Sequence, residues 1–154
     1  MPKCYQLVGV PASGKSTWVA NQSWTKDCAY ISTDHYVEEF AKARGKTYNQ
    51  VFRAVMPDCV RHMTADVVNA RVADQDVIWD QTSTTVGSRA RKFRMLPNYE
   101  HIAVVFAVPE SAELARRLIS RLGKNIPDHV MSSMIKGFEQ PTEAEGFMEI
   151  WNAA

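Results

Sequence analysis

A glycine-rich stretch near the amino terminus has the residue types and spacing of a phosphate-binding loop. Gly9, Gly14, Lys15 and Ser16 match the pattern G-x-x-x-x-G-K-[ST], directly after an apolar run and before a helix-forming one. Glycines let consecutive backbone N–H groups point inward at an anion, while the lysine reaches the β- and γ-phosphates and the serine hydroxyl ligates magnesium. We therefore predict a site for ATP and Mg2+, with an ordinary glycine turn as the alternative. The residues predicted to bind the nucleotide are Gly9, Ala12, Ser13, Gly14, Lys15, Ser16 and Thr17.

Two aspartates follow apolar runs that are typical of buried strands. Asp80 ends the run VIW, and this position predicts an acid that holds Mg2+ through water beside Ser16, with a cap on the next segment as the alternative. Asp34 follows the run CAYIST. A carboxylate at that point serves either as the general base beside an acceptor hydroxyl or as the N-cap of a helix that begins at His35 or Tyr36. The residues alone leave both roles open.

Basic residues gather in two segments. Positions 89–94 hold three arginines and a lysine with no acid among them, which indicates a local surface for a polyanion. In the second segment, Arg117 and Arg121 are four residues apart, so one helix face would carry both guanidinium groups over a triphosphate. A solvated helix face is the alternative for each of these charges. The candidate acceptor-binding residues are His35, Thr82 and Arg89.

Short apolar runs alternate with amphipathic stretches along the chain. This alternation predicts an α/β fold with a parallel sheet that helices cover on both faces. Pro57 is expected to split the long periodic stretch into two helices, because proline is well tolerated only in the first turn of a helix. We expect strands over 4–10, 28–32, 76–82 and 101–108, helices over 16–21, 35–43, 48–72, 88–96, 111–122 and 127–138, and an irregular acidic tail.

Composition narrows the class of protein. A chain of 154 residues with 45% hydrophobic side chains is expected to form one domain over 1–154. The net charge of +1 gives no global basic excess, so any binding of nucleic acid must be local. Three widely spaced cysteines without a CxxC pair, and four histidines without ligand spacing, indicate reduced thiols and no metal framework of Cys or His. With no run approaching a membrane span, we expect a cytoplasmic protein without membrane contact.

Four stretches together resemble the kinase domain of bacteriophage-type polynucleotide kinase and the small P-loop kinases of RNA-repair enzymes. They are GVPASGKSTW, YISTDHY, VIWDQTSTT and RRLISRLGKNIP, in this order over nearly the whole chain. The resemblance implies a three-layer P-loop kinase fold with about four to five parallel strands and a helical lid. It also implies that Asp34 takes the proton of the acceptor hydroxyl, that Lys15 and Ser16 serve phosphate and magnesium, and that Arg121, supported by Arg117, contacts the ATP phosphates from the lid.

One position departs from this family. The family pattern has an arginine three residues after its aspartate, which grips the phosphate beside the acceptor hydroxyl, and Val37 stands there in this chain. The expected acceptor is a nucleic-acid hydroxyl, either a 5′-hydroxyl end or the hydroxymethyl group of a modified pyrimidine in phage DNA, which needs no such arginine. Two other functions stay open: a kinase for a small metabolite or nucleoside, and a nucleotide-binding regulatory or toxin-type module.

Overall fold

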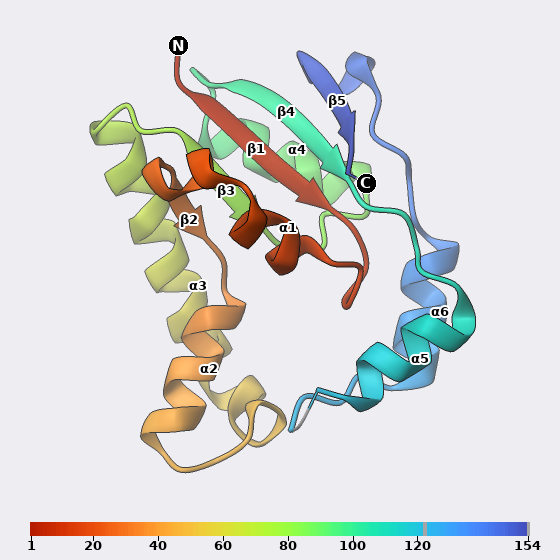
Figure 1. Cartoon of the computed structure of the whole chain (residues 1–154). Coiled ribbons are helices and arrows are strands. Elements are labelled where there is room, and N and C mark those ends of the chain that lie inside the picture. Colours follow the sequence, from red (N-terminus) through yellow and green to blue (C-terminus); the bar gives the residue numbers. More distant parts are fainter. Residues whose placement is uncertain (122, 154) are drawn as a thin grey trace.

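The computed structural model describes residues 1–121 and 123–153, and its core is a parallel sheet in the order β2-β3-β1-β4-β5 (Figure 1). All four strand pairs are parallel, and Leu7 of the central strand lies beside Asp80 on one side and Val104 on the other. Such a sheet confirms the predicted α/β class. The strands are β1 (Lys3–Val8), β2 (Ala29–Ile31), β3 (Val77–Asp80), β4 (Glu100–Val105) and β5 (Glu149–Asn152).

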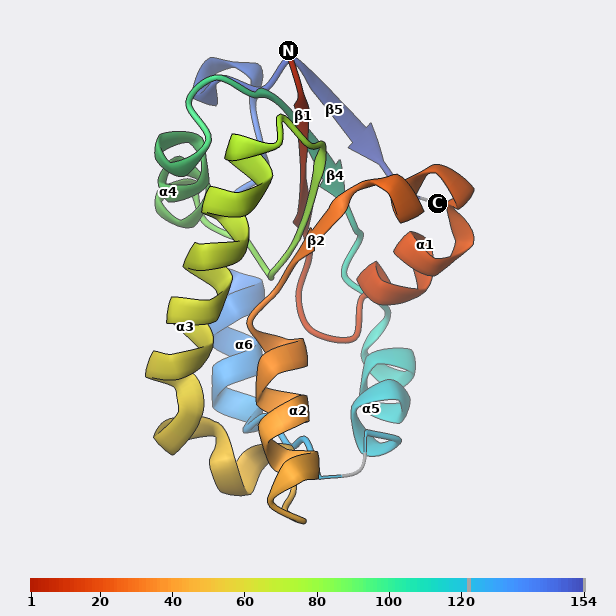
Figure 2. The same ribbon diagram turned by 90° about the vertical axis from the view of Figure 1, so that its left-hand side faces the viewer.

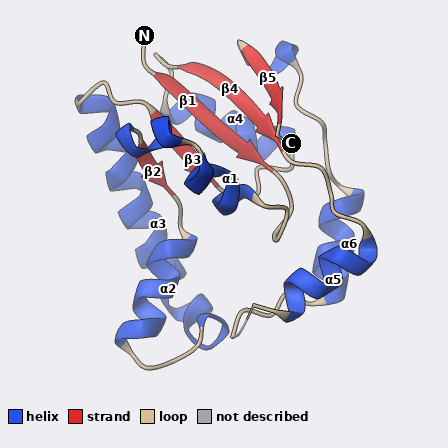
Figure 3. Ribbon diagram, viewed as in Figure 1, coloured by secondary structure: helices blue, strands red, loops and turns tan. Residues whose placement is uncertain are grey.

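Helices cover both faces of this sheet, so the described residues form three layers. In Figure 2, α3 and α4 lie on one side of the strands and α1 lies on the other. Figure 3 shows α1 in front of the strands and α4 behind them. The α-helices are α1 (Lys15–Asn21), α2 (Asp34–Ala43), α3 (Tyr48–Val72), α4 (Val86–Met95), α5 (Ser111–Ile119) and α6 (Asp128–Lys136). Two short 3-10 helices complete the order, η1 (Ser23–Asp27) and η2 (Glu143–Glu145).

The central strand explains how both layers are held. Successive side chains of a strand point to opposite faces. Cys4 packs with Met63 and Val67 of α3. Its neighbour Tyr5 packs on the other face, where the cluster includes Trp18 of α1. Burial of apolar surface on both faces fixes the strand register and thereby the position of the loop that follows β1.

The long helix α3 is continuous, and the predicted break at Pro57 is wrong. The helix runs for 25 residues with Pro57 inside it. A proline in the helix interior removes one backbone hydrogen bond, a cost of about 3 kcal/mol. Apolar burial on both sides of it offsets that cost, because Val51 and Val55 pack against α2 while Met63 and Val67 pack against the sheet.

The carboxyl-terminal segment also differs from expectation. The tail is not irregular, since β5 pairs with β4 from Ile102 beside Glu149 to Val105 beside Asn152. This short edge strand has two half-buried side chains between two exposed ones, so it lacks the apolar run that marked the other strands. The central strands β1 and β4 end two to three residues earlier than predicted, at Val8 and Val105, because the chain leaves the sheet there to form loops.

Helix α5 is shorter than predicted and ends at Ile119. Arg121 therefore follows the helix instead of sharing its face with Arg117, and the predicted end at Leu122 lies outside the described residues. Helix α6 lies within its predicted range. Within residues 1–121 and 123–153, no helix combines the length and the apolar character that crossing a bilayer requires.

Candidate active site

A large cleft of about 1660 Å3 opens beyond the carboxyl ends of β1, β2, β3 and β4. The carboxyl edge of a parallel sheet is where α/β proteins bind ligands, because the loops that leave the strands converge there. One wall of the cleft comes from the loop after β1, a second from α2 and the start of α3, and a third from α5, α6 and the turn between them.

The loop after β1 has the close packing that its glycines predict. A side chain at Gly9 would place its Cβ 2.5 Å from Ser13 Oγ and 2.9 Å from Phe106 Cβ, so only glycine fits. Ala12 and Gly14 both have left-handed backbone conformations, with φ of 64° and 100°. The Gly9 N–H donates to the Thr82 carbonyl at 2.9 Å, which ties this loop to the one after β3. The predicted nucleotide-binding residues thus form this loop and the first turn of α1, and those from Ala12 to Thr17 line the cleft.

Polar groups of this loop are buried where an anion would bind. Lys15 Nζ donates to the carbonyls of Gly9 and Val10, both at 3.0 Å. Burial lowers the pKa of Lys15 to about 8, although Asp80 and Asp34 oppose the shift. Ser13 Oγ is buried and has no hydrogen-bond partner among the described residues. A polar atom in this condition costs about 1–3 kcal/mol, so the loop fits a phosphate ligand that would relieve the cost.

Ser16 and Asp80, the predicted magnesium residues, lie side by side. Ser16 Oγ donates to Asp80 Oδ2 at 3.4 Å, and the Tyr30 hydroxyl donates to the same carboxylate oxygen. Hydroxyl and carboxylate oxygens are suitable ligands for Mg2+, which usually keeps several waters. The part of the chain that the structure describes contains no group of three His, Cys, Asp or Glu able to hold a metal, and Mg2+ in a nucleotide site does not need one.

Asp34 occupies the opposite wall of the cleft, and its carboxylate does not cap α2. The helix begins at Asp34 itself, after Thr33, and no side-chain hydrogen bond caps it. Asp34 Oδ1 accepts from the Tyr48 hydroxyl at 2.7 Å, and Oδ2 accepts from Lys124 Nζ at 2.9 Å. The capping role is therefore wrong, and the role of general base stays a prediction.

The lid consists of α5 and the turn that follows it, and its two predicted phosphate-binding arginines differ in their contacts. Arg117 Nε donates to Glu113 at 2.7 Å and Nη1 donates to the carbonyl of Ala12 at 3.0 Å, which joins α5 to the phosphate-binding loop. Arg121 also lines the cleft, and its Nη1 is buried without a hydrogen-bond partner among the described residues. Both guanidinium groups thus face the cleft, but from a helix and from the turn after it.

Two predicted acceptor-binding residues, His35 and Thr82, line the cleft. The His35 ring lies 3.9 Å from the ring of Tyr36, and its Nδ1 is buried without a partner among the described residues. Val37, at the position where the family pattern has an arginine, is fully buried against α3. The side chain at that position points away from the cleft, so it contributes no group that could grip a phosphate.

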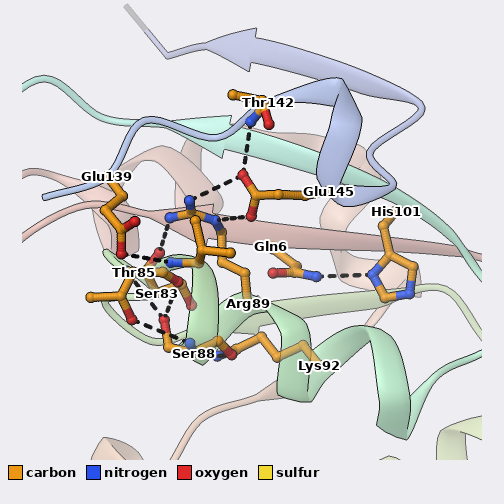
Figure 4. Close-up of polar contacts among 11 residues, drawn as sticks. Gln6, Ser83, Thr85, Ser88, Arg89, Lys92, His101, Glu139, Thr142 and Glu145 are labelled. Atoms are coloured by element: carbon orange, nitrogen blue, oxygen red, sulfur yellow. Dashed lines mark hydrogen bonds and ion pairs between the residues drawn. The ribbon is translucent and has the colours of Figure 1, made fainter.

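The third predicted acceptor-binding residue, Arg89, is not in the cleft. Figure 4 shows its guanidinium group enclosed by Glu145 and the backbone of Ser83. Arg89 is 0% exposed, its Nε donates to Glu145 at 2.8 Å, and its Nη1 donates to the Ser83 carbonyl at 2.9 Å. Lys92 of the same helix is also buried. The prediction for Arg89 is wrong, because the predicted basic helix places two of its four cations in the interior.

Sequence reasoning missed three residues that contact the predicted site residues. Tyr30 bonds to Asp80, and Tyr48 and Lys124 bond to Asp34. In the sequence, Tyr48 is the first residue of the helix predicted over 48–72, and Lys124 lies in the stretch RRLISRLGKNIP. Their contacts join positions 14 and 90 residues away from Asp34, and no local motif reports pairings over such separations.

Comparisons with known proteins agree with this geometry. A family model described as an AAA domain, AAA_33, matches residues 6–141. The bifunctional polynucleotide phosphatase/kinase of Schizosaccharomyces pombe is 26% identical over 149 residues, which are 94% of this chain and 31% of that protein. This chain therefore spans about a third of the length of that relative.

Two solved structures share the fold. One is in the Pnkp1/Rnl/Hen1 RNA repair complex, with a TM-score of 0.64 and 21% identity over 88% of this chain and 43% of that one. The other is a gluconokinase from Sinorhizobium meliloti 1021, with a TM-score of 0.59 and 18% identity over 98% of this chain and 81% of that one. At these identities the likeness concerns the fold, which a kinase of a small metabolite shares with a chain of an RNA repair complex.

Proposed function

The chain belongs to the AAA_33 family of AAA domains, and on that premise we propose that it is an ATP-dependent kinase that phosphorylates a hydroxyl of a nucleic-acid acceptor. The observation that carries the proposal is the placement of Asp34 in the same cleft as the phosphate-binding loop and Arg121. Phosphoryl transfer needs these three parts: a cradle for the phosphates, positive charge on the transferred group, and a carboxylate beside the acceptor hydroxyl.

The donor end of the cleft would hold ATP. The backbone of residues 9–16 and the Lys15 ammonium would bind the phosphates, while Arg117 and Arg121 would neutralise the charge that spreads over the γ-phosphate oxygens. Ser16 and Asp80 would hold Mg2+, which when bound screens the negative charge of the phosphates. Ser13 Oγ and Arg121 Nη1 are buried and find no hydrogen-bond partner within residues 1–121 and 123–153. Both atoms favour an anionic ligand here, since either would gain a hydrogen bond from it.

The acceptor end of the cleft would supply the base. Asp34 would take the proton as the acceptor O–H bond breaks, and the freed oxygen would form its bond to the γ-phosphorus. The bond between that phosphorus and the β–γ bridging oxygen breaks, and ADP leaves. Because the products are a phosphate ester, ADP and one proton on Asp34, the step needs no other reactant.

A nucleic-acid acceptor is supported by the likeness to the polynucleotide phosphatase/kinase, which extends over 94% of this chain. The burial of Val37 bears on which hydroxyl is used. A 5′-hydroxyl end carries a phosphate close to the reacting oxygen, whereas the hydroxymethyl group of a modified pyrimidine does not. Because position 37 holds valine instead of a cationic residue, the hydroxymethyl group is a serious alternative to the 5′-hydroxyl end.

A second candidate is a kinase for a small metabolite or nucleoside. The observation in its favour is the burial of Arg89 and Lys92, which removes half of the basic helix that had indicated a polyanion. The exposed cations of that helix, Arg91 and Arg94, do not line the cleft. A closed acceptor pocket would not require them.

The test is phosphate transfer from γ-labelled ATP to a panel of acceptors. The panel contains 5′-hydroxyl DNA, 5′-hydroxyl RNA, hydroxymethylated duplex DNA, free nucleosides and gluconate, with the Lys15→Ala variant as the control for contaminating kinases. Label in one of the first three, absent with the variant, supports the nucleic-acid acceptor. Label only in nucleosides or gluconate favours the second candidate, and hydrolysis of ATP without transfer to any acceptor contradicts both.

A further inference from the structure

Lys124 reaches the acceptor end of the cleft from the turn after α5. Its Nζ lies 2.9 Å from Asp34 Oδ2 and 3.7 Å from Glu38 Oε1, and 4.5 Å from the ring centroid of Tyr48. Its side chain is only 12% exposed. The lysine thus has a defined, nearly buried position between α2 and α3, unlike the surface lysines whose charge stays in water.

The backbone around Lys124 is docked on the first turn of α3 independently of this ion pair. Asn49 Nδ2 donates to the Asn125 carbonyl at 2.8 Å, and the Asn125 N–H donates to Asn49 Oδ1 at 2.9 Å. The Asn49 N–H donates to the Gly123 carbonyl at 3.0 Å. Gly123 has a φ of 73°, and a Cβ there would lie 2.8 Å from Thr47 Cβ. These contacts close the described part of the lid against α3, the junction seen at the lower end of Figure 1.

The Asp34 carboxylate is held from two sides as a result. Tyr48 donates to one oxygen from α3 and Lys124 donates to the other from the lid. Burial raises the pKa of Asp34, but the charge and hydrogen bond of Lys124, the hydrogen bond of Tyr48 and the charge of Arg121 together bring this pKa below its usual range. The other charged groups that face this cluster are Glu38 from α2 and Lys15 from the phosphate-binding loop.

We propose that Lys124 is a positioning residue of the transfer reaction: from the closed lid it keeps the Asp34 carboxylate ionised and oriented toward the acceptor hydroxyl. This inference rests on the proposed function. It means that the same lid brings Arg121 to the nucleotide and Lys124 to the base, so closure over the donor also completes the acceptor side. When Asp34 takes the acceptor proton and becomes neutral, Glu38 remains as the counter-ion of Lys124.

The experiment compares Lys124→Met, Lys124→Arg and the wild-type protein. The first measurement is the pKa of the Asp34 carboxyl, from its 13C chemical shift during a pH titration of the protein without any substrate. Lys124→Met is expected to raise this pKa, and Lys124→Arg is expected to keep it low because the positive charge is retained. Lys136→Met, which removes an exposed lysine of the neighbouring helix α6, is the matched control and is expected to leave it unchanged.

The second measurement is single-turnover transfer as a function of pH, on the acceptor that the panel identifies. In Lys124→Met the acid limb is expected to move to higher pH, and the rate at its plateau to fall about tenfold with ATP affinity unchanged. A structural role alone would lower both rate and stability without moving the limb, so thermal unfolding is recorded for each variant. Lys124→Gln replaces Lys124→Met if the latter does not fold.

The outcomes separate the two proposals. An Asp34 pKa that stays the same in Lys124→Met, or an acid limb that does not move, overturns the positioning role while the kinase activity stands. Wild-type protein that transfers phosphate to no acceptor overturns the proposed function, and with it any catalytic part for Lys124, whatever the titration shows. A raised pKa, a displaced acid limb and rescue by Lys124→Arg together support the inference.

Discussion

Arg89 and Arg121 carry the same side chain in opposite circumstances. Arg89 belongs to α4 and is fully buried, and both Glu145 oxygens and the Ser83 carbonyl accept its hydrogen bonds. Arg121 faces the cleft, with a buried Nη1 that has no partner among the described residues. A buried charge is tolerated when the fold itself supplies its partners. The first arginine is therefore part of what holds the protein together, and the second is placed for a ligand.

The largest expected effect comes from Arg121. Arg121→Ala should lower the rate of phosphate transfer on the order of a thousandfold, because arginines that stabilise phosphoryl transition states contribute this much or more. Its free energy of unfolding should stay the same or increase, since an incompletely bonded buried group is removed. Single-turnover transfer and urea unfolding measure the two quantities. Normal transfer together with a lower free energy of unfolding would show that Arg121 has a structural role, like Arg89.

The reverse pattern is expected for Arg89. Arg89→Met leaves Glu145 without its buried partner and should lower the free energy of unfolding by about 3 kcal/mol. Transfer per folded molecule should change little, since Arg89 lies outside the cleft. Urea unfolding checks the loss, and the double variant with Glu145→Gln should regain part of it. A large fall in the transfer rate with an unchanged free energy of unfolding would favour the predicted role of Arg89 in acceptor binding.

Asp34→Asn is expected to lower the transfer rate about a hundredfold with ATP affinity nearly unchanged, because the amide cannot take a proton. The aspartate does not cap α2, so the fold should tolerate the change. Transfer rates beside ATP titrations decide the matter. Tyr48→Phe is the matched control, since it removes one hydrogen bond of the same carboxylate and keeps its charge. Unimpaired transfer by Asp34→Asn would refute the general base.

The smallest expected effect separates two lysines, the half-buried Lys15 in the cleft and the buried Lys92 of α4. Burial lowers the pKa of each to about 8. Between that value and the ordinary 10.5 the unfolded chain binds more protons, so the free energy of unfolding should rise as pH rises through this window. ADP should raise the pKa of Lys15 alone, because phosphate favours the ammonium form. NMR titration of both lysines, with and without ADP, tests this; equal shifts would contradict the assignment.

How well a feature could be predicted from the sequence depends on how far apart its interacting residues lie along the chain. The phosphate-binding loop, the strand-end positions of Asp34 and Asp80 and the layered fold depend on local spacing, and the fold came out as expected. The split at Pro57 and the irregular tail were wrong, because packing against distant elements decided both. A charge run cannot distinguish Arg89 from Arg121 either, since Glu145 is 56 residues away from Arg89 in the chain.

The separation of Arg89 and Glu145 in the chain also determines when the two residues can meet during synthesis. The ribosome adds residues in order, at about 5–20 per second, so the 56 residues between Arg89 and Glu145 take about 3 to 11 s to make. During this interval the Arg89 guanidinium group lacks the carboxylate of Glu145. Its free energy is then lowest in water. The burial of Arg89 with Glu145 is therefore expected to be one of the last steps of folding on the nascent chain, because the pair cannot form before Glu145 has been made.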